Sequence, residues 1–359
     1  MTLKAAYFQL RADYFGRPMD DGILRALLGA GYVVDVFAPD GDLPQTEYGD
    51  GVRRRSVEYR RSWLQRHLRR GKWRAYDLFL GTADLPMAFA GMLAYVAGRP
   101  SVSVCDEIYL GGYEGQATLY WKSLTRWAMR RARFTIITDV VRNPLQREYA
   151  GLPAGHEFIP FPSSYATPYD GRSREEARSA LGIADDEFVV SSTGSCRSEN
   201  GTEWLVRLAG RDGIRIMIQT AGRPDPVTDA LLRRLEGALY LPERLGFRES
   251  TATTIAADVS AVFYLSPKPQ FQHMGVSSQK LGTALWLGMP VVATRQESFR
   301  FIEDYRCGEL IDREEDLPAA LQRIRANRLE YAANALRATA ESIRPAEKLE
   351  HLTDRLKRL

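Results

Sequence analysis

The sequence comprises 359 residues, of which 45% are hydrophobic and 26% charged, and its formal net charge is +4 at pH 7. This length accommodates two domains with separate cores, and so modest a net charge gives no reason in itself to expect a nucleic-acid partner. The three cysteines are far apart, the four histidines lack metal-ligand spacing, and we find neither a signal-like nor a membrane-spanning apolar run, so we expect a cytoplasmic protein without disulfides or a bound metal.

In the first half of the chain, short apolar runs alternate with amphipathic segments. The apolar runs predict strands at residues 4–10, 33–38, 77–81, 101–105 and 133–138. Helical periodicity predicts helices at residues 20–30, 85–96, 117–132 and 141–150. Such alternation is typical of a parallel sheet covered by helices on both faces, so we predict a first α/β domain over residues 1–165.

The same alternation resumes after a Tyr-, Pro-, Gly- and Arg-rich segment at 165–174, whose composition is typical of a linker. Strands are predicted at residues 187–193, 214–220, 239–240, 259–265 and 291–294, and helices at 202–209, 226–236, 279–287, 317–327 and 329–342, with further elements at 298–304 and 307–311. We therefore predict a second α/β domain over residues 166–343 and a C-terminal helix over 344–359. Two such halves are expected to bind ligands in a cleft between them.

The segment 270–294 joins a polar loop, a short helix and a β-rich run. The predicted helix begins at residues 277–279, where unpaired backbone N–H groups and the positive end of the helix dipole suit an anion, and Lys280 adds a full positive charge. Gly288 and Pro290 end the helix. The same pattern also fits an ordinary helix-to-strand connection in a doubly wound sheet, and it does not by itself decide between the two.

From Lys280 to Thr294 the chain runs Lys-Leu-x-x-Ala-Leu-x-x-Gly-x-Pro-Val-Val-Ala-Thr, which resembles the donor-binding segment of GT-B glycosyltransferases, especially the family-4-like group. In that fold two Rossmann-like domains face a central cleft, a C-terminal helix crosses back to the first domain, and this helix holds the ribose and phosphates of a nucleotide-sugar. Retaining members carry an E-x7-E pair here, whereas this sequence has Gly275 and Thr283. The run Met-Gly-Val-Ser-Ser-Gln-Lys is closer to inverting xanthan-type glucuronosyltransferases. The resemblance implies donor contacts from Met274, Ser277, Ser278, Gln279, Lys280 and Thr283.

A second candidate anion site follows a predicted strand. The small residues Gly194 and Ser195 let the backbone approach an anion, and Arg197 can donate a forked pair of hydrogen bonds to phosphate. GT-B enzymes usually have a lysine where Asn200 stands, so the resemblance leaves one diphosphate charge missing or supplied by Lys280. The alternative is a plain strand-to-helix turn with a solvated arginine.

Residues 245–250 resemble the segment that packs around the nucleotide base in these enzymes. The resemblance implies that backbone groups near Gly246 and Phe247 contact the edge of the base and that the Phe247 ring packs on its face. The alternative is that Phe247 belongs to the hydrophobic core.

An inverting sugar transfer needs a general base that takes the proton of the acceptor hydroxyl. Asp106 and Glu107 directly follow a predicted strand, at the carboxyl end where parallel sheets bind ligands, and they are the first candidates. Asp20 and Asp13, after the first strand, are further candidates. Adjacent carboxylates at such a place also often cap a helix or lie in a solvated turn. Contacts to the acceptor are expected from residues in the two neighbouring loops, namely Arg11, Asp13, Arg17 and Tyr113.

Basic residues are concentrated in the first domain. Between residues 53 and 74 ten Lys and Arg residues accompany a single acidic one, Glu58, and Trp63 and Trp73 are interleaved. Residues 117–133 repeat this combination with further aromatic side chains. Basic helices that carry tryptophan suit an anionic membrane surface and would place the domain beside a lipid-linked acceptor. A solvated basic surface and a nucleic-acid patch are the alternatives.

These features predict a GT-B glycosyltransferase of the hexosyl- or glycuronosyltransferase class. It would move a sugar from a UDP- or GDP-linked donor to a sugar or lipid-linked acceptor, with inversion and without a metal or cofactor, in polysaccharide, glycolipid or other glycoconjugate synthesis. We expect a cytoplasmic enzyme in peripheral contact with the inner face of the membrane, without a nucleic-acid partner. Two alternatives stay open: a nucleotide-sugar epimerase on the same fold, and a catalytically silent nucleotide-sugar-binding protein.

Overall fold

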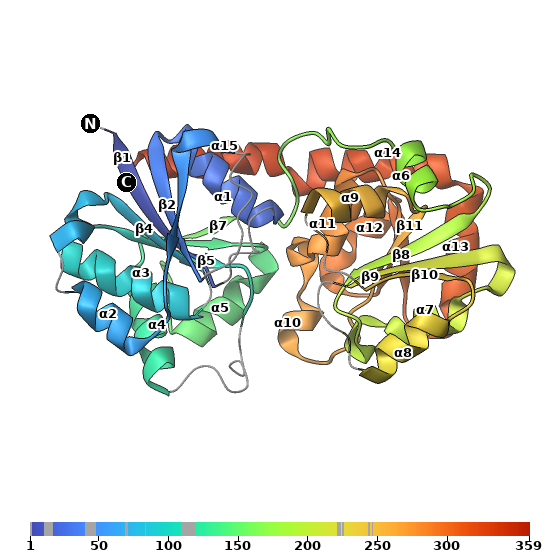
Figure 1. Ribbon diagram of the computed structural model, residues 1–359, viewed down its shortest axis with the longest axis horizontal. Coiled ribbons are helices and arrows are strands. Elements are labelled where there is room, and N and C mark those ends of the chain that lie inside the picture. Colours follow the sequence, from blue (N-terminus) through green and yellow to red (C-terminus); the bar gives the residue numbers. More distant parts are fainter. Residues whose placement is uncertain are drawn as a thin grey trace. The chain divides into compact units, whose positions relative to one another are not determined.

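In the computed structural model, the chain divides into two compact units (Figure 1). The first comprises Met1–Pro162 and Pro345–Leu359, and the second comprises Ser163–Arg344. The structure describes residues 2–10, 17–39, 48–68, 71–82, 84–108, 119–220, 224, 226–242, 245 and 247–359. The second unit begins slightly before the boundary expected at residue 165, because its first residues bind to it. The Ser163 N–H donates to the Val276 carbonyl at 3.0 Å, and the Ser164 hydroxyl donates to the Gly282 carbonyl at 3.3 Å.

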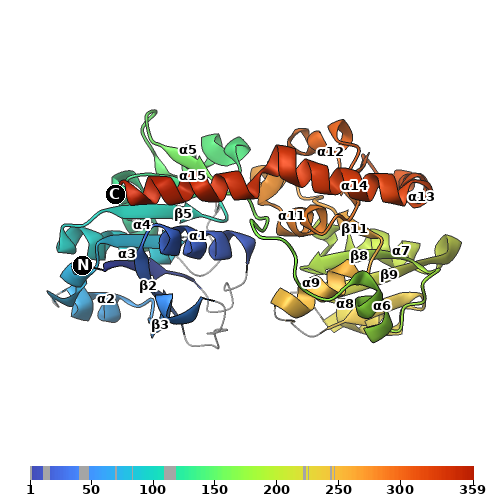
Figure 2. The same ribbon diagram turned by 90° about the horizontal axis from the view of Figure 1, so that it is seen from above.

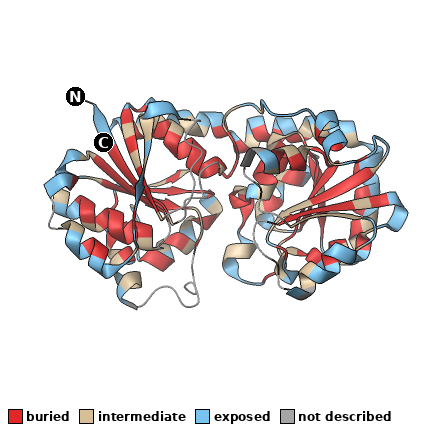
Figure 3. Cartoon of the chain, viewed as in Figure 1, coloured by how far each residue is buried: buried red, intermediate tan, exposed pale blue. Residues whose placement is uncertain are grey.

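The first unit is built on one parallel sheet in the order β3-β2-β1-β4-β5-β6-β7. Its strands are β1 (Leu3–Phe8), β2 (Tyr32–Ala38), β3 (Val52–Ser56), β4 (Leu78–Thr82), β5 (Ser101–Cys105), β6 (Thr135–Ile137) and β7 (Phe158–Pro160). The strands β4, β5 and β6 are buried along their whole length, as Figure 3 shows for the centre of the sheet. Continuous apolar strands of this kind are characteristic of parallel sheets with both faces covered, as the sequence predicts.

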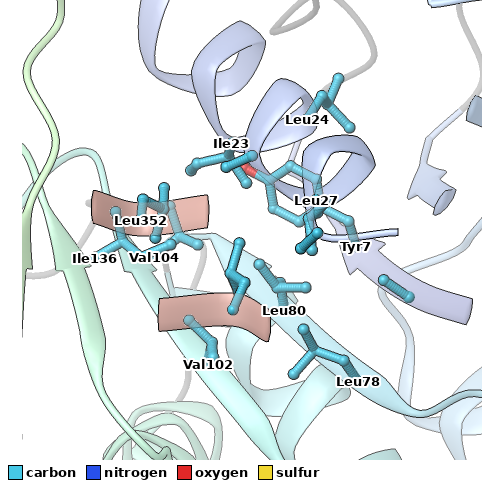
Figure 4. Packing of buried hydrophobic residues seen from close by; sticks show 14 of the residues in the cluster. Tyr7, Ile23, Leu24, Leu27, Leu78, Leu80, Val102, Val104, Ile136 and Leu352 are labelled. Atoms are coloured by element: carbon cyan, nitrogen blue, oxygen red, sulfur yellow. The ribbon is translucent and has the colours of Figure 1, made fainter. Parts of the chain in front are cut away.

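Helices cover both faces of this sheet. One face is covered by α1 (Pro18–Gly29) and α15 (Pro345–Lys357), which lie side by side (Figure 2). Ile23 and Leu27 of α1 and Leu352 of α15 pack there on Leu80 and Val104 of the sheet (Figure 4). On the other face lie α2 (Arg61–Leu68), α3 (Asp84–Ala97), α4 (Leu119–Arg131) and α5 (Asn143–Ala150). The expected C-terminal helix is therefore present, and it belongs to the core of the first unit.

Two elements of the first unit, β3 and α2, are not predicted from the sequence. The strand β3 has the sequence Val-Arg-Arg-Arg-Ser and pairs with β2 at the edge of the sheet. Because most of its residues are arginines, it lacks the apolar run from which a strand is predicted. The helix α2 carries Trp63 and Leu64, and both side chains are buried against the sheet together with Trp73. The expectation that Trp63 and Trp73 face an interface is therefore wrong, because these two rings are part of the hydrophobic core.

The second unit repeats the architecture with a parallel sheet in the order β10-β9-β8-β11-β12-β13. Its strands are β8 (Phe188–Gly194), β9 (Ile214–Thr220), β10 (Ala238–Leu241), β11 (Val259–Val262), β12 (Val291–Thr294) and β13 (Gly308–Ile311). Its helices are α6 (Arg174–Ala180), α7 (Thr202–Leu208), α8 (Pro226–Arg234), α9 (Phe247–Ile255), α10 (Pro269–Gln272), α11 (Gln279–Trp286), α12 (Phe301–Asp304), α13 (Leu317–Ala326) and α14 (Arg328–Ala338).

The helix α9 is the main element of this unit that the sequence pattern does not predict. Its central residues are threonines, which favour strands and caps over helix interiors. The Thr253 and Thr254 hydroxyls donate at 2.8 Å to the carbonyls of Glu249 and Ser250, one turn earlier. Bonds to the preceding turn let these side chains lie buried inside a helix, since each hydroxyl finds an acceptor on the backbone.

The order of the strands in each sheet shows where a ligand fits. In a doubly wound sheet the connections turn to opposite sides at one point, and the carboxyl ends of the two strands there frame a crevice. In the first unit this point lies between β1 and β4, and in the second it lies between β8 and β11. The polar residues that follow these strands are therefore the first to consider as functional groups.

Within the described ranges, no helix is long and apolar enough to cross a bilayer.

Candidate functional site

A buried carboxylate lies at the carboxyl edge of the first sheet. Asp20, in the first turn of α1, has a relative exposure of 3%, and its Oδ1 accepts hydrogen bonds from the Tyr7 hydroxyl and from Gln9 Nε2, both at 2.7 Å. Tyr7 belongs to β1, and Gln9 directly follows the carboxyl end of that strand. The two donors fix the carboxylate where a ligand of this sheet would bind.

A second carboxylate, Asp106, accompanies Asp20. It directly follows β5, its Oδ2 lies 3.7 Å from Nη1 of Arg17, and its Oδ1 is buried without a hydrogen-bond partner in the described part of the chain. Burial raises the pKa of Asp106. Burial also raises the pKa of Asp20, with the Asp106 charge as the next cause, to about 7, although Arg17 acts in the opposite direction. Two carboxyl groups that disfavour each other's ionisation leave one of them able to exchange a proton near neutral pH.

Glu107, the neighbour of Asp106, has a different environment. Its Oε1 accepts from Arg142 Nη2 at 2.5 Å and from the Ile108 N–H at 3.0 Å. The Arg142 side chain has a relative exposure of 1%, so this ion pair is built into the unit, whereas the Glu107 side chain is 39% exposed. Glu107 thus neutralises a buried guanidinium, and this structural role already accounts for its charge.

The residues expected to contact an acceptor are described only in part. Arg17 lies directly before α1 and faces Asp106. Arg11, Asp13 and Tyr113 lie outside the described residues.

The corresponding edge of the second sheet carries a buried amine. Lys280 lies in the first turn of α11, and its Nζ is buried and has no hydrogen-bond partner among the described residues. The Nζ lies 5.2 Å from the centroid of the Tyr264 ring, and Tyr264 follows β11. Burial lowers the pKa of Lys280 to about 8, against a smaller opposing effect of Cys196, which follows β8. The amine therefore lies at the carboxyl ends of β8 and β11, at the point where the connections of this sheet change sides.

The beginning of α11 is held in place by its own side chains. The Ser278 hydroxyl accepts from the Leu281 N–H at 3.3 Å and lies 2.8 Å from the Tyr264 hydroxyl. Ser278 is thus a helix cap, and its side chain is occupied. The backbone N–H groups of Gln279 and Lys280 have no acceptor within the helix, so they are the donors that an anion would find here.

The other expected donor residues around α11 differ in exposure. Gln279 is exposed, whereas Ser277 and Thr283 are buried with relative exposures of 8% and 9%. Met274 is buried in the hydrophobic core of the unit. The backbone and the amine of α11 are therefore better placed for a ligand than Met274.

The loop after β8 is shaped for a close approach of the backbone. Gly194 has a φ of 108°, a conformation that other residues rarely adopt. The Asn200 amide donates to the Ser195 carbonyl at 2.8 Å, and the Thr202 hydroxyl donates to the Arg197 carbonyl at 3.1 Å. Asn200 therefore braces the loop, while the Arg197 side chain is exposed. Asn200 thus takes a structural role at the position where GT-B enzymes usually have a lysine, and Lys280 places a buried amine at this edge.

The expected base-binding segment leads into α9, which begins at Phe247. Gly246 lies outside the described residues, and so does the Phe247 side chain. Within α9, the Ser250 hydroxyl donates to Gln219 Oε1 at 3.1 Å.

Four residues of these two edges were not predicted as part of a site: Tyr7, Gln9, Arg142 and Tyr264. Gln9 and Tyr264 do carry a signal in the sequence, since each is a polar residue within two positions of a strand end. Tyr7 lies inside the strand that the sequence predicts at residues 4–10, where it reads as a core residue, and Arg142 lies in a helical turn, so neither gives such a signal. In the described ranges, we find no group of three or more His, Cys, Asp or Glu side chains arranged to hold a metal ion.

Known structures share this fold. HepE from Anabaena, solved in complex with UDP-glucose, aligns with a TM-score of 0.73 and 16% sequence identity over 99% of this chain and 100% of that chain. Sucrose-phosphate synthase from Thermosynechococcus elongatus aligns with a TM-score of 0.68 and 15% identity over 99% and 96%. A glycosyltransferase from Rickettsia africae aligns with a TM-score of 0.73 and 11% identity over 99% and 98%. No protein-family model and no curated sequence relative matches the chain. The expected GT-B fold class is therefore confirmed.

Proposed function

We propose that this protein is a glycosyltransferase that takes a sugar from a nucleotide-diphosphate sugar. The observation that carries the proposal is the buried, unpartnered amine of Lys280 beside the first N–H groups of α11. An ammonium and a helix N-terminus together suit the diphosphate of such a donor. HepE, which has the same fold, binds UDP-glucose, so a UDP-linked sugar is our first choice of donor and a GDP-linked sugar the second.

In the proposed reaction the donor is bound at the edge of the second sheet. When the bond between the anomeric carbon and the diphosphate breaks, its electron pair stays on the phosphate oxygen, and negative charge grows there. The Lys280 ammonium and the N–H groups of Gln279 and Lys280 would stabilise that charge more strongly in the transition state than in the bound donor. This role needs no metal ion, so we propose metal-independent transfer.

The first unit would supply the general base. The acceptor hydroxyl attacks the anomeric carbon while its proton passes to a carboxylate, and the configuration of that carbon inverts. Of the three candidates, we favour Asp20, because Tyr7 and Gln9 orient it and its pKa of about 7 suits proton transfer at neutral pH. Asp106 would raise the basicity of Asp20, and Arg17 would orient an acidic group of the acceptor.

A transfer assay tests this function. Radiolabelled UDP-glucose, UDP-galactose, UDP-glucuronate and GDP-mannose are each incubated with the protein and with either oligosaccharides or a polar lipid extract. We expect label from one donor to move to one acceptor fraction, at a rate that EDTA leaves unchanged and that Asp20→Asn lowers by about a hundredfold or more. Donor binding without movement of label would contradict the proposal and favour the silent nucleotide-sugar-binding protein.

A further inference from the structure

The exposed face of α4 combines aromatic and basic side chains. From residue 115 to residue 138 the sequence contains no Asp or Glu. The residues of α4 that are exposed or partly exposed follow one another at helical spacing, namely Tyr120, Ser123, Arg126, Trp127, Arg130 and Arg131. Of these, Trp127 is partly buried, because it also packs against the core cluster of Ala128 and Met129. The opposite side of α4 is buried against the sheet and α3, through Ala128 and Met129 among others. The helix thus presents a basic, aromatic face to its surroundings.

The end of α3, the neighbour of α4 in Figure 1, extends this face. Tyr95 and Val96, in the last turn of α3, have relative exposures of 59% and 45%. The Tyr95 and Trp127 rings meet edge to face with their centroids 5.5 Å apart. The Arg131 guanidinium lies 4.9 Å from the Tyr95 centroid and 5.3 Å from the Trp127 centroid. The rings therefore form one surface cluster with a cation over it, which we call the α3–α4 face.

A third aromatic residue, Tyr120, continues the α3–α4 face toward the beginning of α4. Tyr120 is 53% exposed, and the Arg61 guanidinium lies 5.7 Å from its ring centroid. Tyr120 and Trp127 are seven residues apart, so they lie on the same side of the helix. No ion pair occupies Arg126, Arg130 or Arg131 within the part of the chain that the structure describes. Arg126 lies over the Tyr149 ring, with its guanidinium carbon 5.3 Å from the centroid, and Arg131 lies over Tyr95 and Trp127, so their described contacts are with rings and leave their positive charge without a neutralising carboxylate.

The side chains of the α3–α4 face favour an anionic bilayer over a single-stranded nucleic acid as its partner. Single-stranded nucleic acids bind aromatic rings through stacked bases, but here Arg131 covers Tyr95 and Trp127, which leaves them poor stacking platforms. At a bilayer surface, by contrast, Tyr and Trp rings insert at the headgroup level, and arginine side chains extend to the phosphates. Apolar Val96, exposed beside them, also gains from insertion into an interface and gains nothing from a nucleic acid.

We propose that the α3–α4 face is a docking surface for a bilayer that contains anionic phospholipids. The Arg residues of α4 provide the charge complementarity, and Tyr95, Val96, Tyr120 and Trp127 provide the groups that enter the interface. Binding is peripheral and reversible, because the face offers a few side chains and no inserted helix. The docking surface thus lies on α3 and α4. It does not include the tryptophans at positions 63 and 73, which are buried in the core.

Vesicle binding tests this surface with the full chain. We expect co-sedimentation with vesicles of phosphatidylcholine and phosphatidylglycerol, weaker binding to pure phosphatidylcholine, and a decrease as the salt concentration rises. Replacing three arginines of α4 by glutamine should weaken partition into the anionic vesicles by about a hundredfold (R126Q, R130Q and R131Q). A triple variant of exposed arginines in the second unit removes the same charge and should bind nearly as well as the wild type (R211Q, R300Q and R313Q).

A third variant distinguishes the contribution of ring insertion from that of charge. Trp127→Ser with Tyr95→Ser keeps every arginine, and we expect it to weaken vesicle binding most clearly at high salt, where the charge is screened. Equal losses in the two arginine variants, or no binding to anionic vesicles, would overturn the proposal, and so would a preference for a single-stranded RNA oligonucleotide over vesicles. Vesicle binding needs neither donor nor acceptor, so its failure is distinguishable from a failure of the proposed transfer.

Discussion

The buried amine of Lys280 leads to a prediction in which ligand affinity and stability change in opposite directions. Its Nζ has no hydrogen-bond partner among the described residues, and burial lowers the pKa of the amine from 10.5 to about 8. A difference of this size corresponds to about 3 kcal/mol by which the folded protein disfavours the charged amine. A charged group that destabilises the protein without ligand, and that lies in a proposed binding site, is expected to stabilise the bound anionic ligand.

The perturbation is Lys280→Met, which keeps an unbranched side chain, one atom shorter than that of lysine, and removes its charge. At pH 7 the unfolding free energy should rise by up to about 3 kcal/mol, because the variant no longer buries an unpaired ammonium. Affinity for UDP should fall by about 10- to 100-fold, since a hydrogen bond to a charged group contributes roughly 1.5–3 kcal/mol. Urea unfolding and calorimetric titration measure the two effects. Lys357→Met, which removes a 52% exposed lysine in the first unit, is the matched control and should change neither.

The pH dependence gives the same prediction an independent check. Because the folded-state pKa of Lys280 lies below the unfolded value, the unfolded chain binds more protons between about pH 8 and 10.5, so the unfolding free energy should rise with pH through this window. A bound diphosphate favours the ammonium and should restore its pKa. At pH 8 UDP binding should therefore take up about half a proton, seen as a dependence of the binding enthalpy on the buffer. Lys280→Met should abolish the uptake. Unchanged UDP affinity in the variant, or UDP binding to the wild type without proton uptake, would show that Lys280 does not contact the diphosphate.

Further predictions concern the first sheet edge and the core of the second unit. Asp20 must lose its proton to act as a base, so kcat/KM should rise as the pH increases through about 7, and Asp106→Asn should move this rise to lower pH because it removes a charge that raises the pKa of Asp20. A pH profile of kcat/KM measures both, and a profile that Asp106→Asn leaves in place would contradict the pairing. In the second unit, Asp258 is 5% exposed and accepts from the buried Arg178 at 3.3 Å. Asp258→Asn should lower the unfolding free energy by about 3–5 kcal/mol, because it leaves a buried guanidinium uncompensated. Urea unfolding measures this, with the 60% exposed Asp304→Asn as control, and equal effects in both would contradict the account.

The sequence predicts most of the fold because parallel sheets leave a strong pattern. The strand expected at 214–220 is β9 (Ile214–Thr220), and the helix expected at 279–287 is α11 (Gln279–Trp286). Each is an apolar run or an amphipathic segment bounded by glycine or proline. The missed elements lack that pattern for local reasons. The strand β3 lies at an edge and carries arginines, and α9 is rich in threonines, of which Thr253 and Thr254 donate to backbone carbonyls.

The candidate site is predictable in position but not in detail. Asp20, Asp106 and Lys280 were expected at strand or helix ends. The structure places Asp20 and Lys280 at the switch points of the two sheets, and it places Asp106 at the end of β5, beside Arg17. Their differences come from contacts between residues distant in sequence, such as the pairing of Glu107 with Arg142, which periodicity does not encode. The burial of a side chain is equally hard to predict from the sequence. The tryptophans at positions 63 and 73 are surrounded in the sequence by basic residues, yet they belong to the core.

The central claim is that the second unit holds a nucleotide-diphosphate sugar, and a thermal-shift panel with calorimetric follow-up tests it most directly. The protein is heated with UDP, GDP, ADP and UDP-glucose, each over a range of concentrations. At a hundred times its Kd, a ligand stabilises the native state by about 2.7 kcal/mol, so we expect a resolvable rise in Tm with UDP or GDP and with the matching nucleotide-sugar. A Tm that none of these ligands changes, with no heat of binding, would mean that the second unit does not hold such a donor and that the likeness to glycosyltransferases is one of fold alone.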